Sequence, residues 1–288
     1  MFGNFLIGLR EGLEATLVVV LLMAYLTRTG RSALKPKVWA GVAVAILVSI
    51  GFGALLTFGP RGLTFQAQEA IGGGLSIVAV ALVTWMLTWM AKASKSMDVR
   101  LAEQVDSAEA KGTMWAVVAV GAFSVGREGL ETTLFLWAAA RGTGETWEPI
   151  IGALGGILVA VVLGLLINRG AVHLDLKKFF TWTAGFLVFV AAGILAYAVH
   201  DLQEAGILPG LHNLAFDVSG VIAPAGILGT VIKAIFNLSP AMTWLECTVW
   251  VLYVAIVFPL YLRRVRGKRK AAEAASATKA PVVEPASA

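Results

Sequence analysis

Long apolar stretches recur along the whole chain, which has 288 residues, 58% of them hydrophobic and 14% charged. Soluble domains carry roughly a quarter charged residues, so this balance indicates a membrane protein. A helix needs about 20 apolar residues to cross the hydrocarbon core, where it satisfies its own backbone hydrogen bonds. The sequence therefore predicts an all-α polytopic membrane protein with seven transmembrane helices, at about residues 4–27, 38–58, 67–91, 113–139, 149–167, 179–200 and 244–262.

Two further segments do not fit a full span. Residues 217–236 are apolar, but Gly220 and Pro224 interrupt them and Lys233 adds a charge, which favours a re-entrant or interfacial piece. After Arg266 the chain consists of Ala, Glu, Lys, Pro and Ser without periodicity, which is typical of disorder. We therefore expect a transmembrane permease domain over 1–262 and a basic, then disordered, cytoplasmic tail over 263–288.

The distribution of basic residues predicts the orientation. With seven spans, 18 of the 23 Lys and Arg residues fall in linkers on one side and three fall on the other, while Arg10 and Arg127 lie inside spans. Cytoplasmic loops carry the excess of Lys and Arg, so we expect the N-terminus outside and the C-terminus in the cytoplasm. The same asymmetry explains the sequence pI of about 9.4, and nucleic acid is not an expected partner.

An internal repeat carries most of the functional information. Seven of ten positions are identical between residues 8–17 and residues 125–134, at a constant offset of 117. Both copies contain Arg-Glu-Gly-Leu-Glu, at 10–14 and 127–131, in the first and fourth predicted spans. Since two spans intervene, these two run in opposite directions, which is the pattern of a 3+3 inverted repeat with a site near the midplane. The seventh span would be an addition.

The motif favours a cation site. Glutamates three apart share a helix face with Cβ atoms roughly 5–6 Å apart, and each charge in a span costs on the order of 2.5–3.5 kcal/mol. Each motif has a net charge of −1, so two facing motifs match a divalent cation, and carboxylates suit iron, manganese, magnesium or calcium. Buried ion pairs that lock helix packing are the alternative, but two inverted copies favour binding. The predicted metal ligands are Glu11, Glu14, Glu128 and Glu131, with Arg10 and Arg127 in support.

Other donors are few. One cysteine and three histidines exclude an internal disulfide and a thiolate cluster, and they leave a His-rich centre poorly supplied. Candidate ligands at the outer mouth lie where the third span begins and the sixth ends, although solvated helix ends would look the same. These candidates are Glu69, His200, Asp201 and Glu204. Glu246, near the outer end of the seventh span, is ambiguous.

The two Arg-Glu-Gly-Leu-Glu motifs, with the His200–Glu204 stretch, resemble the oxidase-dependent iron permease family and its bacterial EfeU-type high-affinity iron transporters. The resemblance covers roughly residues 1–262. It implies iron import across the bacterial inner membrane, with iron as the transported ion and no permanently bound cofactor. It also implies partners in trans, namely a periplasmic iron-binding protein and a haem peroxidase, or a ferroxidase.

Two alternatives use the same residues. A manganese or magnesium transporter would need the same carboxylates, and charge alone does not separate it from an iron permease. An intramembrane di-iron enzyme would normally use Glu-x-x-His pairs. No Glu in this sequence has a His three residues later, so the chain is not expected to be an enzyme.

Overall fold

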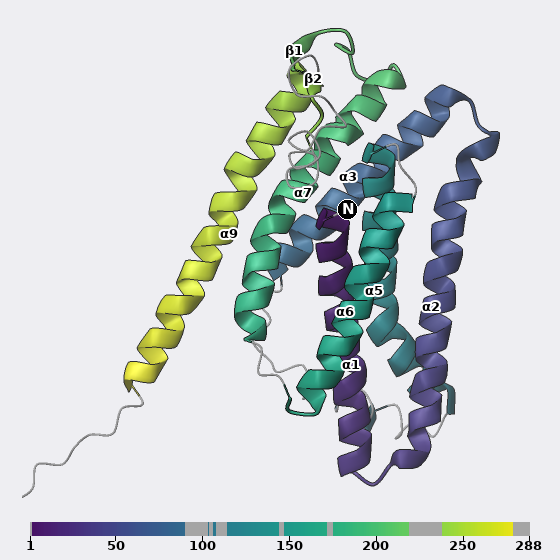
Figure 1. Ribbon diagram of the computed structural model, residues 1–288, viewed down its shortest axis with the longest axis vertical. Coiled ribbons are helices and arrows are strands. Elements are labelled where there is room, and N and C mark those ends of the chain that lie inside the picture. Colours follow the sequence, from purple (N-terminus) through teal and green to yellow (C-terminus); the bar gives the residue numbers. More distant parts are fainter. Residues whose placement is uncertain are drawn as a thin grey trace, which may run out of the picture.

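The computed structural model describes residues 2–89, 103, 106–107, 114–143, 147–171, 175–218 and 238–278. Within these ranges the fold is built mainly of long α-helices, which confirms the all-α polytopic class (Figure 1). Short 3-10 turns at Ser32–Leu34 and Gly59–Gly62 join the first helices. The helices are α1 (Phe2–Arg28), α2 (Lys35–Phe58), α3 (Phe65–Trp89), α5 (Met114–Thr143), α6 (Trp147–Asn168), α7 (Leu176–Glu204) and α9 (Trp244–Thr278).

Hydropathy separates these helices into two groups. By length and composition, α2, α3, α6, α7 and α9 are each apolar enough to cross a membrane. The helices α1 and α5 fall outside this group because every 18-residue window in them includes at least three charged residues. They are the two helices that carry the repeated motif. The charges that weaken their apolar signal are therefore those of the two motifs.

The helices pack in pairs that follow the predicted repeat. Helix α1 lies along α6, α2 lies along α5, and α3 lies along α7, while α9 packs against α7 at one side of the molecule (Figure 1). In the predicted repeat α1 corresponds to α5 and α2 corresponds to α6. The α1–α6 pair in one half is therefore equivalent to the α5–α2 pair in the other. Near the end of α1, Leu22 and Leu26 pack with Val117 at the start of α5, whereas Glu11 lies beside Glu128. The helices α1 and α5 therefore run antiparallel.

Equivalent close contacts occur in both pairs. A Cβ atom at Gly12 would lie 3.0 Å from Ala160 Cβ, and one at Gly129 would lie 2.3 Å from Ser49 Oγ. One turn further on, Gly164 faces Thr16 and Gly53 faces Thr133 in the same way. In both contacts the residue on α1 and its equivalent on α5 differ by 117 in number, and the residue on α2 and its equivalent on α6 differ by 111. These matched contacts support the inverted repeat, and they show that a helix approaches each motif glycine closely, as small residues permit.

Polar contacts fix the ends of several helices. Asp175 caps α7, since its side chain accepts a hydrogen bond from the Lys178 backbone N–H. At the end of α1, Tyr25 and Arg31 donate hydrogen bonds to Asp106, at 2.7 and 2.6 Å. Both bonds favour the ionised form and lower the pKa of the Asp106 carboxyl. The carboxylate thereby ties the connection after α3 to the α1–α2 turn.

The opposite end of the molecule has a small antiparallel sheet, formed by β1 (Leu214–Asp217) and β2 (Ala241–Thr243). Buried Gln203 fastens this connection to α7, because its side chain donates to the Pro209 carbonyl and accepts from the Thr243 hydroxyl. Residues 219–237 lie outside the described residues, so the re-entrant assignment of 217–236 stays a prediction beyond β1.

Helix α9 continues beyond the predicted seventh span. That span was expected to end at residue 262, with disorder after Arg266, but the helix extends to Thr278. Alanine, lysine and glutamate are strong helix formers, and extending an existing helix needs no new nucleus. The expectation of disorder therefore fails as far as Thr278, while residues 279–288 lie outside the described part.

Candidate metal centre

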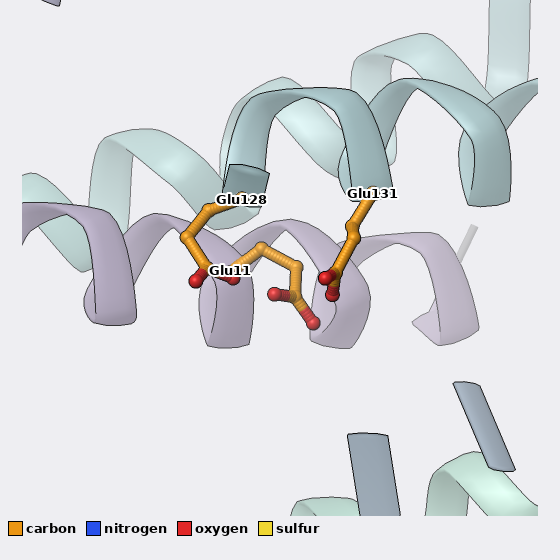
Figure 2. Close-up of side chains that lie close together, drawn as sticks. All are labelled: Glu11, Glu128 and Glu131. Atoms are coloured by element: carbon orange, nitrogen blue, oxygen red, sulfur yellow. The ribbon is translucent and has the colours of Figure 1, made fainter. Parts of the chain in front are cut away.

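Three carboxylates from two helices converge between α1 and α5. Oxygen atoms of Glu11, Glu128 and Glu131 all lie within 4.8 Å of one another, with Glu11 on α1 and the other two on α5 (Figure 2). A single ion can bridge ligand atoms at such separations, because iron, magnesium and calcium bind carboxylate oxygens at about 2.0–2.6 Å. The convergence of the two motif copies, which the repeat predicts, is thus present in the fold.

Burial makes this cluster chemically unusual. Glu11 is 1% exposed and Glu128 is 5% exposed. One oxygen of each carboxylate, the Oε2 atom of Glu11, Glu128 and Glu131, is buried and has no hydrogen-bond partner among the described residues. Unsatisfied buried carboxylate oxygens are costly, and three of them in one place fit a site that binds a cation.

Each arginine of the repeat forms ion pairs with its own two glutamates. On α1, Arg10 lies 3.4 Å from Glu11 Oε1 and 3.3 Å from Glu14 Oε1. On α5, Arg127 lies 2.8 Å from Glu128 Oε1 and its Nε lies 3.5 Å from Glu131 Oε1. The guanidinium groups cannot be ligands, because they remain protonated and offer only donors. They orient the carboxylates and reduce the repulsion between them.

The fourth predicted ligand occupies a different position. Glu14 is 3% exposed and pairs with Arg10, but its carboxylate is not among the three whose oxygens converge. Glu14 lies one turn beyond Glu11 on the same helix. The structure thus brings together three of the four glutamates and places the fourth beside them.

The two motif copies differ in exposure. The Arg10 side chain is 2% exposed, whereas that of Arg127 is 48% exposed, and the side chains of Glu14 and Glu131 are 3% and 17% exposed. The second copy therefore lies beside more accessible space than the first. Because the two motifs have the same sequence, this difference in exposure could not be predicted from them.

This asymmetry predicts unequal losses of stability. Replacing Arg10 with Gln should lower the free energy of unfolding by about 3 kcal/mol, because it leaves Glu11 and Glu14 buried without their counter-charge. Arg127→Gln should lower it by about 1 kcal/mol or less, since the Arg127 side chain is half exposed and its ion pairs are less buried than those of Arg10. Thermal unfolding of the detergent-purified variants measures both effects. Equal losses in the two variants would contradict the assignment of different surroundings.

A second polar cluster lies near the C-terminal end of α5. Arg141 donates to Glu69 at the start of α3, with a distance of 2.6 Å, and its Nε lies 3.5 Å from Asp201 near the end of α7. The Glu69 and Asp201 side chains, predicted as separate candidates, are thus brought together by an arginine. They are 12% and 14% exposed, so neither is a fully solvated helix end.

His200 and Glu204 belong to the same end of the fold. The His200 Nδ1 atom lies 2.9 Å from Glu246 on α9, and its Nε2 atom lies 3.6 Å from Glu204. Glu246 is 4% exposed but the His200 side chain is 40% exposed, so this contact is partly buried. Sequence reasoning left Glu246 ambiguous and missed the contacts of Arg141, because both pairings join helices that are distant in the chain.

Comparisons with known proteins assign a family to this arrangement. The family model described as "Iron permease FTR1 family" matches residues 1–267. The chain belongs to this iron permease family. It is 40% identical over 266 residues to the "Ferrous iron permease EfeU" of Escherichia coli O6:H1, which covers 90% of this chain and 96% of that protein. The proteins of the same name from Shigella sonnei and Yersinia pestis are 40% and 38% identical, over 92% and 98% of their lengths.

Membership confirms the family that the motifs indicated, and with the apolar helices it supports a multi-pass bacterial membrane protein. No solved structure matches the chain. The geometry of the three carboxylates therefore comes from this fold alone.

Proposed function

We propose that this chain is a high-affinity permease that imports ferrous iron and binds it transiently between the two Arg-Glu-Gly-Leu-Glu motifs. The observation that carries the proposal is the convergence of Glu11, Glu128 and Glu131 in a buried cluster with unpartnered oxygens. Membership of an iron permease family supports iron as the ion, and the EfeU relatives are named ferrous iron permeases.

The charge of the site fits such an ion. Four glutamates and two arginines give a net charge of −2, which one divalent cation neutralises. Membrane potential then favours inward movement, by about 2.3 kcal/mol per charge for each 100 mV. Glu69 at the start of α3, with Asp201 and Glu204 at the end of α7, are proposed as the first carboxylates that bind the ion.

Transport by the purified protein in liposomes tests the substrate. With an inside-negative potential and ascorbate to keep iron reduced, radioactive ferrous iron should accumulate at micromolar concentrations, and manganese should accumulate more slowly. Empty liposomes control for leak. Equal or faster uptake of manganese would overturn the assignment of iron, and the absence of any metal uptake would overturn the assignment as a permease.

The proposed orientation places the N-terminus outside and the basic C-terminal residues in the cytoplasm. Cys247, in the first turn of α9 and partly buried, then lies near the outer surface. A membrane-impermeant maleimide should label Cys247 in intact spheroplasts, and a Cys247→Ser variant gives the background. Labelling that requires disrupted membranes would reverse the orientation.

The partners implied by the family resemblance are part of the proposal as separate proteins. A periplasmic iron-binding protein and a haem peroxidase or ferroxidase would deliver iron to the outer end. If uptake in liposomes proceeds without them, they raise the supply of iron and are not components of the pathway itself.

A further inference from the structure

Arg141 has an unusual position in the outer cluster. Its guanidinium group lies between Glu69 and Asp201, which come from α3 and α7, and so takes the place that a bridging cation would occupy. Arginine remains charged at any physiological pH, so it neutralises these carboxylates whenever it lies there. While Arg141 is in this position, both carboxylates are paired with it and are not free to bind an incoming ion.

The Arg141 side chain is held by packing contacts as well as by ion pairs. The guanidinium carbon lies 5.7 Å from the ring centroid of Trp137, one turn earlier on α5. On another side the group lies directly against the Gly72 backbone, where a Cβ atom would be 2.6 Å from Arg141 Nε. A glycine at 72 therefore leaves the space that the arginine fills.

The pairing is incomplete. Arg141 makes one short hydrogen bond, to Glu69, but its contact with Asp201 is 3.5 Å long and its buried Nε has no hydrogen-bond partner among the described residues. A guanidinium group held fully would donate from both edges of its fork to two acceptors. Arg141 is thus bound tightly to Glu69 and only weakly to Asp201.

Arg141 also lies on the helix that carries half of the metal centre. Ten residues separate it from Glu131, which corresponds to about 15 Å along α5. A cation between Glu69 and Asp201 is therefore within a short path of the midplane cluster.

We propose that Arg141 is a tethered counter-cation that ferrous iron must displace from Glu69 and Asp201, and whose return drives the ion onward to the midplane carboxylates. This inference rests on the proposed function. The arginine weakens iron binding at the mouth and prevents the ion from staying there. Removing it should therefore tighten apparent binding and slow transport at saturation.

Uptake kinetics of ferrous iron in liposomes test this role. For Arg141→Gln, the half-saturating iron concentration should fall about tenfold, as expected for loss of one competing charged partner, and the maximal rate should also fall severalfold. Arg141→Lys keeps the charge, so its half-saturating concentration and maximal rate should lie between those of Arg141→Gln and those of the wild type. Arg31→Gln is the matched control, because it also breaks a 2.6 Å ion pair between distant segments, and its half-saturating concentration should be unchanged.

A purely structural role gives a different result. If Arg141 serves only to hold α3, α5 and α7 together, the maximal rate falls while the half-saturating concentration stays the same or rises, and the proposal is wrong. If Arg141→Gln does not yield folded protein, Trp137→Leu replaces it, since it removes the ring face but keeps the charge. A two- to fivefold lower half-saturating concentration in that variant supports the proposal, and an unchanged one overturns it. Failure of the wild type to carry iron would instead reject the proposed function.

Discussion

Replacing Glu128 with Gln should reduce ferrous iron uptake by at least about tenfold, and Glu11→Gln should do the same. Each change removes a negative charge and a ligand oxygen from the converging cluster but keeps the size of the side chain. Even residues that only hydrogen-bond to a metal ligand commonly contribute a factor of 10–100 to affinity, so loss of a ligand should cost no less. Initial uptake rates in liposomes, normalised to the amount of folded protein, give the comparison.

Two further variants sharpen this result. Glu148→Gln is the matched control, because Glu148 is exposed in the first turn of α6, and its uptake should equal that of the wild type. Glu14→Gln should have a smaller effect than Glu11→Gln, since the Glu14 carboxylate lies outside the group of three. Wild-type uptake by well-folded Glu11→Gln and Glu128→Gln would remove the cluster from the pathway.

The sequence was sufficient to predict the helices and the meeting of the two motifs. Within the described residues hydropathy identified each long helix, including α1 and α5, because the apolar residues around their charges are numerous enough to require burial. Antiparallel placement of the repeat followed from the count of intervening spans. The contact between Glu11 and Glu128 is a direct consequence of that placement.

The details of the site were not predictable in the same way. Two identical motifs gave no reason to separate Glu14 from Glu131, or to expect Arg127 to be half exposed while Arg10 is buried. Such differences arise from the surroundings. Helix α9 packs against α7, in the second half, and belongs to no repeated unit of the predicted scheme, so an inverted pair of motifs lies in an asymmetric molecule.

The outer cluster illustrates a second limit. Local spacing identified His200, Asp201 and Glu204 because they share one helix end, but it could not supply their partners. Those partners, Arg141 on α5 and Glu246 on α9, come from distant parts of the chain. Since single charges near helix ends usually face water, a sequence gives no sign that these residues contact one another.

Substituting alanine for Gly8 or Gly156 should destabilise the fold by about 3 kcal/mol, near the upper end for overpacking. These glycines face each other where α1 crosses α6. A Cβ atom at Gly8 would lie 2.2 Å from the Ala153 carbonyl oxygen, and one at Gly156 would lie 2.1 Å from the Phe5 carbonyl oxygen. The opposing atoms are backbone, so no side-chain rotation relieves the clash and the two helices must separate. Thermal unfolding of purified variants measures the loss.

Helix propensity alone predicts that Gly→Ala stabilises a helix. Glycines without close neighbours are therefore suitable controls. Gly51 and Gly74 are also within helices, but a Cβ atom there would meet nothing within 4 Å. At these positions alanine should leave stability unchanged or raise it by about 0.5–1 kcal/mol, because glycine is the poorer helix former. Equal effects at all four positions would contradict close packing of α1 on α6. Since Gly8 lies one turn before Glu11, separating these helices should also move that carboxylate away from Glu128 and Glu131, so Gly8→Ala should lose iron uptake in the fraction that still folds.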